Sequence, residues 1–145
     1  MAIAGAAWWG CEAEHESTAD APPGSVVYLG RVEDWQREVV LHLASALSYV
    51  SIFEGFGLPP LEAMARGTAV LTSNATSLPE VVGDAALQVD PFDEHAIAEG
   101  ITRILTDDRL REELVARGGP RAATFTAART GQAAMTAFRT ALAPT

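Results

Sequence analysis

The chain has 145 residues, of which 48 % are apolar and 20 % charged, and its formal net charge is −9. This composition fits one compact globular domain and argues against wholesale disorder. The acidic balance argues against a nucleic-acid partner, because phosphate backbones are held by clustered Lys and Arg. It leaves a nucleotide ligand open, since backbone N–H groups and a helix N-terminus can bind a single diphosphate.

The cysteine count, the lengths of the apolar stretches and the first seven residues argue against a membrane protein, a secreted protein and thiol chemistry. The single cysteine, Cys11, rules out an internal disulfide and a thiolate metal cluster, and it lies in no recognisable nucleophile motif. The longest apolar stretches are interrupted by Gly, Pro or a charge well before 18 residues, so no transmembrane segment is expected. Residues 1–7 lack the basic start of a signal peptide. We therefore expect a cytoplasmic protein.

The first third of the chain is expected to hold two strands and a helix. Residues 2–7 form a short apolar run that predicts a buried strand. Residues 8–24 contain acids and turn formers, which favours a loop with at most one short helix. Residues 26–29 predict a second buried strand. The apolar spacing over residues 33–45 then predicts a helix.

The remainder continues this alternation of strands and helices. Ser77 and Glu80 have the spacing of a capping box at the start of a short helix. A helix from residue 107 to 117 is expected to stop at Gly118-Gly119-Pro120. The other expected elements are strands at 47–53, 68–72 and 85–89, and helices at 59–66, 93–105 and 121–142. The pattern predicts an α/β fold, a Rossmann-like, doubly wound parallel sheet covered by helices on both faces.

The most informative segment is residues 54–62, Glu-Gly-Phe-Gly-Leu-Pro-Pro-Leu-Glu. It lies between a predicted strand and a predicted helix, at the edge of the sheet where ligands bind in open α/β folds. Gly55 and Gly57 allow the backbone to turn and to approach a ligand closely. Free N–H groups at this helix start would favour an anion such as a diphosphate.

Two carboxylates flank this turn. A carboxylate can accept two hydrogen bonds at once, which suits a vicinal diol such as a ribose. Taken singly, each glutamate has a structural alternative: Glu62 could complement a helix dipole, and Glu54 could be a solvated loop residue. Their combination within one nine-residue string favours the functional interpretation.

Residues 54–62 resemble the E-x7-E element of the family-4 glycosyltransferases, which are retaining enzymes with the two-domain GT-B fold. The similarity extends over residues 2–140. Residues 27–32 resemble the family's strand and turn beside the base, residues 60–70 its next helix and strand, and residues 73–86 the loop that follows. The chain is thus similar to the C-terminal, donor-binding half of a GT-B fold.

The resemblance implies transfer of a sugar from a nucleotide-diphosphate sugar to an acceptor, with retention of configuration. Glu54 would be the catalytic residue, in contact with hydroxyls of the transferred sugar. Glu62 would hold the ribose hydroxyls, and the backbone near Val32 would meet the base. The expected donor-binding residues are Gly55, Phe56, Gly57, Leu58, Glu62 and Val32. No metal and no other cofactor is expected, because the family generally needs none.

The chain also departs from the family pattern. Residues 1–145 are expected to form a single, N-terminally truncated nucleotide-sugar-binding domain without the N-terminal acceptor domain. The strand whose Arg and Lys grip the diphosphate is expected to be missing as well. Arg31 and Arg66 are the nearest candidates to replace them, but the interpretation as a surface or helix-end cation is favoured for each. Other hypotheses remain open: a non-catalytic nucleotide-sugar-binding module, a subunit that needs a separate acceptor-domain chain, a truncated product without function, or a GT-B relative such as a nucleotide-sugar epimerase.

Overall fold

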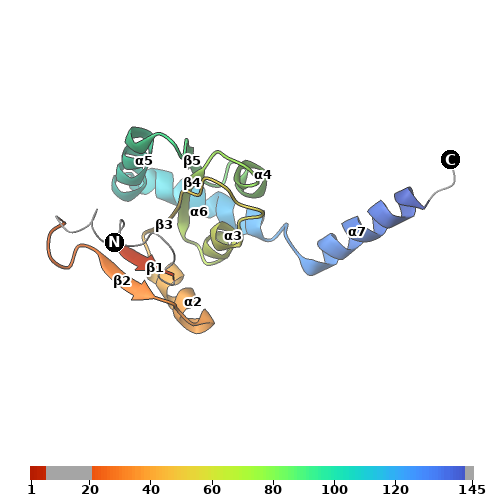
Figure 1. Ribbon diagram of the computed structural model, residues 1–145, viewed down its shortest axis with the longest axis horizontal. Helices are drawn as coiled ribbons and strands as arrows, with labels where there is room; N and C mark the ends of the chain where they lie inside the picture. Colours follow the sequence, from red (N-terminus) through yellow and green to blue (C-terminus); the bar gives the residue numbers. More distant parts are fainter. Residues whose placement is uncertain (6–20, 143–145) are drawn as a thin grey trace. The chain divides into compact units, whose positions relative to one another are not determined.

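The computed structural model describes residues 1–5 and 21–142 (Figure 1). The chain forms two compact units, Met1–Val40 and Leu41–Thr145. Cys11 and most of the loop predicted for residues 8–24 lie outside the described residues. None of the helices in the described part combines the length and the apolar character needed to cross a membrane.

The first unit contains a small parallel sheet. Strand β1 (Ala2–Ala4) pairs with β2 (Val27–Gly30), and helix α2 (Asp34–Leu43) begins after it and ends in the second unit. Both strands were predicted, but the expectation that they are buried was wrong. Most of their residues are exposed, and the Val27 side chain, for example, is 48 % exposed. Two strands of three and four residues have too little surface to cover each other's faces.

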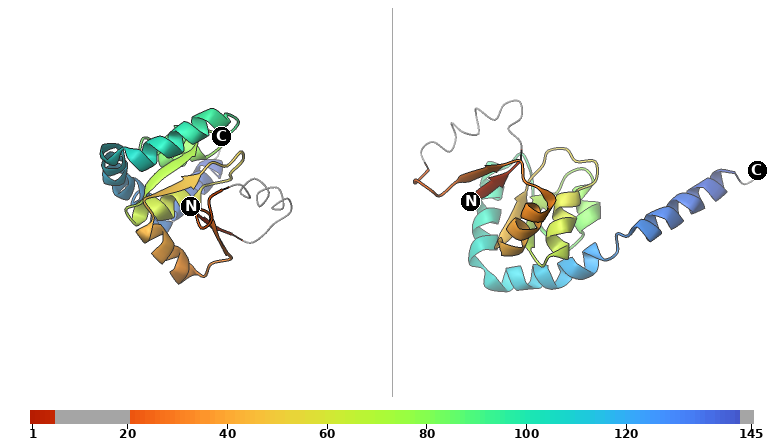
Figure 2. Two further views of the ribbon diagram at one scale, coloured as in Figure 1. Left: turned by 90° about the vertical axis from the view of Figure 1, so that its left-hand side faces the viewer. Right: turned by 90° about the horizontal axis from the view of Figure 1, so that it is seen from below.

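The second unit is built on a three-stranded parallel sheet in the order β3-β4-β5. Its strands are β3 (Ala46–Tyr49), β4 (Ala69–Ser73) and β5 (Leu87–Val89). Its helices are α3 (Leu58–Ala65), α4 (Leu78–Val82), α5 (Glu94–Thr106), α6 (Asp108–Ala122) and α7 (Ala127–Ala141). Figure 2 shows this sheet among its helices. Every residue of the central strand β4 is buried, including the polar Thr72 and Ser73, as expected for a parallel strand covered on both faces.

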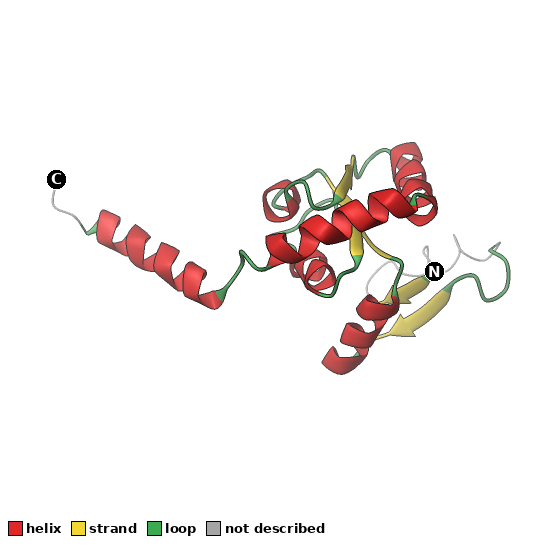
Figure 3. Cartoon of the chain, turned by 180° about the vertical axis from the view of Figure 1, so that it is seen from behind, coloured by secondary structure: helices red, strands yellow, loops and turns green. Residues whose placement is uncertain are grey.

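Alternate residues of β4 point into two separate cores. Val70 belongs to a cluster with Leu61 and Met64 of α3 and with residues of α4. Leu71 belongs to the other cluster, with Ile104 of α5 and residues of α6. Side chains alternate between the two faces of a strand, so helices cover both faces of the sheet (Figure 3). The predicted α/β arrangement of parallel strands and flanking helices is confirmed.

The predicted helix stop at Gly118-Gly119-Pro120 was wrong, because α6 continues to Ala122. Gly118 is buried against α3, where an added Cβ would lie 3.2 Å from Met64 Cγ. The missing side chain lets the two helices pack closely, and this packing outweighs the low helix preference of the Gly-Gly-Pro sequence. As a result the last helix begins at Ala127 rather than at residue 121.

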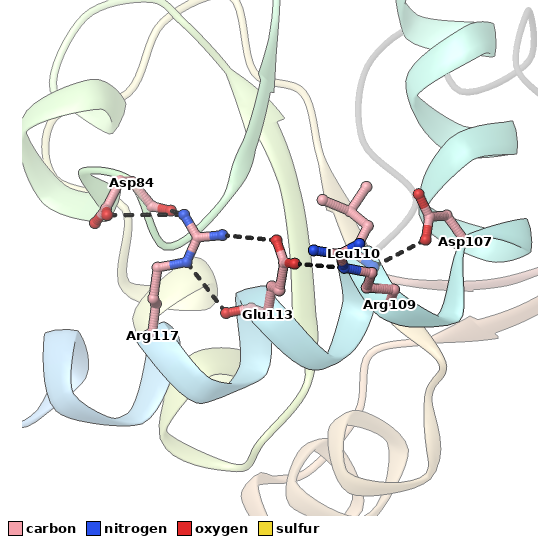
Figure 4. Close-up of polar contacts among 6 residues, drawn as sticks. All are labelled: Asp84, Asp107, Arg109, Leu110, Glu113 and Arg117. Carbon is pink, nitrogen blue, oxygen red and sulfur yellow. Dashed lines mark hydrogen bonds and ion pairs between the residues drawn. The ribbon is translucent and has the colours of Figure 1, made fainter.

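Polar contacts define the start and the exposed side of α6 (Figure 4). The Asp107 carboxylate accepts from the N–H of Leu110 at 2.9 Å and so caps the helix. Glu113 pairs with Arg109 at 3.0 Å and with Arg117 at 3.5 Å, and Arg117 donates to the carbonyl of Asp84 at 2.9 Å. Exposed pairs of this kind each contribute little, about 0.3–0.5 kcal/mol. The Arg117–Asp84 contact also ties α6 to the segment between α4 and β5.

Candidate functional site

The candidate site lies at the carboxyl edge of the three-stranded sheet. Strand β3 ends at Tyr49 rather than running to residue 53, and β4 ends at Ser73. The Thr72 hydroxyl donates to the Tyr49 carbonyl at 3.0 Å, and the Ser73 hydroxyl donates to the Ser51 carbonyl at 2.6 Å. The loops leaving both strands are therefore held together at the edge where open α/β sheets bind ligands.

The turn between β3 and α3 depends on the glycine at position 57. Gly57 is the N-cap of α3 and has a left-handed backbone with φ 108°. An added Cβ would lie 2.7 Å from Cδ2 of Leu78, which is fully buried and has little room to move. Only glycine satisfies both conditions. Pro59 lies in the first turn of α3, as the sequence predicts.

This turn leaves some backbone donors without partners in the described part of the chain. No side chain caps α3. Pro59 and Pro60 have no N–H, and the N–H groups of Phe56, Gly57 and Leu58 find no acceptor among the residues that the structure describes. Unpaired N–H groups at the start of a helix attract anions. The turn therefore offers a short row of donors for a negatively charged ligand.

The carboxylate of Glu54 is held by two donors. The Tyr49 hydroxyl donates to Oε2 at 2.6 Å, and the N–H of Gly55 donates to Oε1 at 3.2 Å. Burial, followed by the hydrogen bond to Glu54 and its negative charge, raises the pKa of Tyr49 to about 12. The hydroxyl therefore remains a proton donor at neutral pH. Sequence reasoning missed Tyr49; an aromatic residue with a polar tip at a strand's carboxyl end is the signal that could have identified it.

The loop after β4 supports the backbone of the same turn. The N–H of Glu54 donates to the Thr76 hydroxyl at 3.1 Å. The Ser77 hydroxyl lies within hydrogen-bond distance of two turn carbonyls, at 2.8 Å from that of Glu54 and 3.1 Å from that of Phe56. Thr76 has a left-handed backbone with φ 53°, a conformation that costs energy for a β-branched residue. The loop after β4 therefore holds the backbone of the turn by hydrogen bonds from Thr76 and Ser77.

The predicted capping box at Ser77 and Glu80 was wrong. Ser77 does precede α4, but it makes no side-chain hydrogen bond to the helix. Its own backbone is already helical, with φ −79° and ψ −17°, whereas a capping residue needs an extended conformation for its oxygen to reach back to the helix. The hydroxyl is used by the turn from Glu54 to Phe56 instead.

The second carboxylate, Glu62, lies on α3 in the same unit as Glu54 and is partly buried. Its carbonyl accepts from the Arg66 guanidinium at 3.0 Å, so this cation is engaged at the end of its own helix. Val32 belongs to the first unit, where it lines a pocket of about 300 Å³. The residues lining that pocket are Leu29, Arg31, Val32, Trp35, Gln36, Val39 and Val40.

An aromatic contact joins the turn to the linker between α6 and α7. The rings of Phe56 and Phe125 meet edge to face with centroids 5.8 Å apart. Arg121 lies over Phe125 at 5.1 Å and also donates to the carbonyl of Val81 at 2.9 Å. Sequence reasoning did not anticipate this contact, because Phe56 and Phe125 are far apart in the chain. It stabilises one flank of the turn.

Comparison with known proteins identifies the family of the chain. Residues 2–119 match the family model described as "Glycosyl transferases group 1". The O-antigen chain mannosyltransferase B of Escherichia coli is 49 % identical over 102 residues, which cover 70 % of this chain and 27 % of that protein. The chain therefore spans about a quarter of the length of this curated relative.

Solved structures give the same result for the fold. Sucrose-phosphate synthase from Thermosynechococcus elongatus matches with a TM-score of 0.76 and 27 % identity, over 96 % of this chain and 38 % of that one. HepE from Anabaena, in complex with UDP-glucose, matches with a TM-score of 0.80 and 18 % identity, over 97 % of this chain and 40 % of that one. At that identity the second match supports the fold alone.

Proposed function

The chain belongs to the group 1 glycosyl transferases, and from this premise we propose that it carries the donor-binding site of a retaining glycosyltransferase. The reaction is transfer of a sugar from a nucleotide-diphosphate sugar to an acceptor. The observation that carries the proposal is the turn from Glu54 to Leu58, where a fixed carboxylate lies beside N–H donors that have no acceptor among the described residues. That pairing suits a ligand with hydroxyls next to a diphosphate.

The site residues then have distinct roles. Glu54 accepts hydrogen bonds from the transferred sugar and favours the positive charge that develops at its anomeric carbon. The N–H groups of Phe56, Gly57 and Leu58 stabilise the charge that builds on the departing diphosphate. Glu62 holds the ribose hydroxyls. A contact of the Val32 backbone with the base stays a prediction from the sequence.

The donor and the cofactor requirement are part of the proposal. The similarity to a mannosyltransferase makes mannose the first sugar to test. We expect the reaction to need no metal; within the described residues, His, Cys, Asp and Glu side chains form no group of three or more that could hold an ion. A cytoplasmic location and a separate acceptor-domain chain stay predictions from the sequence.

A second candidate function is a nucleotide-sugar-binding module that does not catalyse transfer by itself. The sequence contains no lysine, and Arg66, the cation nearest to Glu62 in sequence, donates to a carbonyl of its own helix. With no lysine in the sequence and Arg66 bonded to its own helix, we expect donor binding to be weak. Turnover with an added acceptor separates the two functions, and the anomeric configuration of the product tests retention.

A calorimetric titration tests the proposal. The purified chain is titrated with GDP-mannose, UDP-glucose and ADP-glucose, and with GDP, UDP and ADP. We expect one nucleotide series to bind with a dissociation constant in the range of about 0.1–1 mM, and the nucleotide sugar to bind more tightly than its diphosphate. Absence of binding by all six compounds at millimolar concentration would refute donor binding.

A further inference from the structure

Tyr49 is a polar side chain that the sheet holds beside the Glu54 carboxylate. It ends strand β3, where it is in register with Thr72 of the buried strand β4. The Thr72 hydroxyl donates to the Tyr49 carbonyl at 3.0 Å. The backbone of Tyr49 is thus fixed by the sheet, and its hydroxyl reaches the carboxylate five residues on, at 2.6 Å.

The Glu54 side chain would otherwise have few constraints. It is only partly buried, and its carboxylate also accepts from the N–H of the adjacent Gly55, at 3.2 Å. That contact is long and local, and it moves with the turn itself. The hydrogen bond from the Tyr49 hydroxyl is short, and its donor belongs to a strand of the sheet. The negative charge of the acceptor strengthens it. It is therefore the contact that links the orientation of the carboxylate to the rigid part of the unit.

We propose that Tyr49 is a positioning residue, whose hydroxyl holds the Glu54 carboxylate in the orientation that accepts hydrogen bonds from the donor sugar. The role rests on the proposed function of Glu54. From residues 1–5 and 21–142 each carboxylate oxygen receives one donor, which leaves it a lone pair for a ligand hydroxyl. In this role Tyr49 acts through Glu54, and its effect is on the affinity for the sugar alone.

The high pKa of Tyr49 is consistent with this role. A phenol with a pKa of about 12 keeps its proton in the physiological range, so the Tyr49 hydroxyl remains a donor to Glu54 there. A histidine or a second carboxylic acid in the same place would release the glutamate when its protonation changed.

The first test needs no ligand. Tyrosine labelled with ¹³C at Cζ is titrated by NMR in the intact chain and in Glu54→Gln. The chain's other tyrosine, Tyr28 on β2, is the internal reference. We expect Glu54→Gln to lower the Tyr49 pKa from about 12, because the variant removes the charge of Glu54 and leaves only the effect of burial. An unaltered Tyr49 pKa would show that the two side chains do not interact, and would overturn the proposal.

The second test separates positioning from stability. Tyr49→Phe removes only the hydroxyl, and Tyr28→Phe is the matched control. The readout is the sugar increment, defined as the affinity for a nucleotide sugar divided by that for its diphosphate, for the best-binding nucleotide in the panel. We expect Tyr49→Phe to reduce the sugar increment by roughly tenfold, or to unity where the increment of the unaltered chain is smaller than that. The affinity for the diphosphate should not change. A structural role alone would weaken both ligands together.

A double variant completes the test. If Tyr49 acts through Glu54, adding Tyr49→Phe to Glu54→Gln changes the sugar increment no further. An additional loss of several-fold in the double variant, or an intact increment in Tyr49→Phe, would refute the positioning role and leave the proposed function in place. Absence of any binding by the unaltered chain would refute the proposed function, and the positioning role with it.

Discussion

Gly57→Ala is expected to destabilise the second unit by about 2–4 kcal/mol and to abolish donor binding. The alanine would adopt a backbone with φ 108°, which L residues rarely tolerate, and its Cβ would lie 2.7 Å from Cδ2 of a buried leucine, Leu78. Either Leu78 moves within a packed core or the turn moves away from it. In the second case the N–H groups of Gly57 and Leu58 no longer line up at the start of α3.

The matched control is Gly55→Ala, two residues earlier in the same turn. Gly55 has no left-handed backbone, and an added Cβ there would meet nothing within 4 Å. Urea unfolding should give a change of less than about 0.5 kcal/mol for this variant. Equal stability of Gly55→Ala and Gly57→Ala would mean that Gly57 does not hold the turn against Leu78.

Glu62→Ala should weaken binding of a nucleotide sugar and of its diphosphate by the same factor, about 10- to 100-fold. A hydrogen-bonded charged group contributes about 1.5–3 kcal/mol, and Glu62 is assigned to the ribose that both ligands share. The variant should still fold, because Glu62 is only partly buried.

The ribose assignment can be tested by removing the hydroxyl instead of the carboxylate. Calorimetry compares the best-binding nucleoside diphosphate with its 2′-deoxy counterpart. The unaltered chain should prefer the ribose form, and Glu62→Ala should lose that preference. Glu99→Ala, an exposed acid on α5, controls for the loss of one negative charge. A ribose preference that survives Glu62→Ala would assign the carboxylate a structural role.

The periodicity of the sequence predicted the elements because local pattern and tertiary packing agree over most of the second unit. Val70 and Leu71 alternate between two cores, and α3 begins at the prolines that suit its first turn. The stop at Gly118 was wrong because that glycine serves packing against Met64, which no local pattern reveals. The expectation that β1 and β2 are buried was wrong because an apolar run does not show how many strands and helices will pack against a strand.

The candidate site was predicted in part. Glu54 and Gly57 stand out in the sequence because spacing and residue type identify them together. The residues that hold the turn could not be identified that way. Ser77 matched a capping pattern, yet its hydroxyl contacts carbonyls more than twenty residues earlier in the chain. Phe125 meets Phe56 only through the fold of α6. Contacts between loops of different strands depend on sheet order, which short-range patterns do not encode.

The turn from Glu54 to Glu62 is the centre of the proposed site, at which we expect the diphosphate and the sugar of the donor to bind. Amide NMR of the ¹⁵N-labelled chain, during titration with GDP-mannose or the best-binding nucleotide sugar, tests this role most directly. We predict that the largest amide shifts occur at Phe56, Gly57 and Leu58, and that they are absent in Gly57→Ala. Saturating shifts confined to other parts of the chain, with these three amides unmoved, would contradict it.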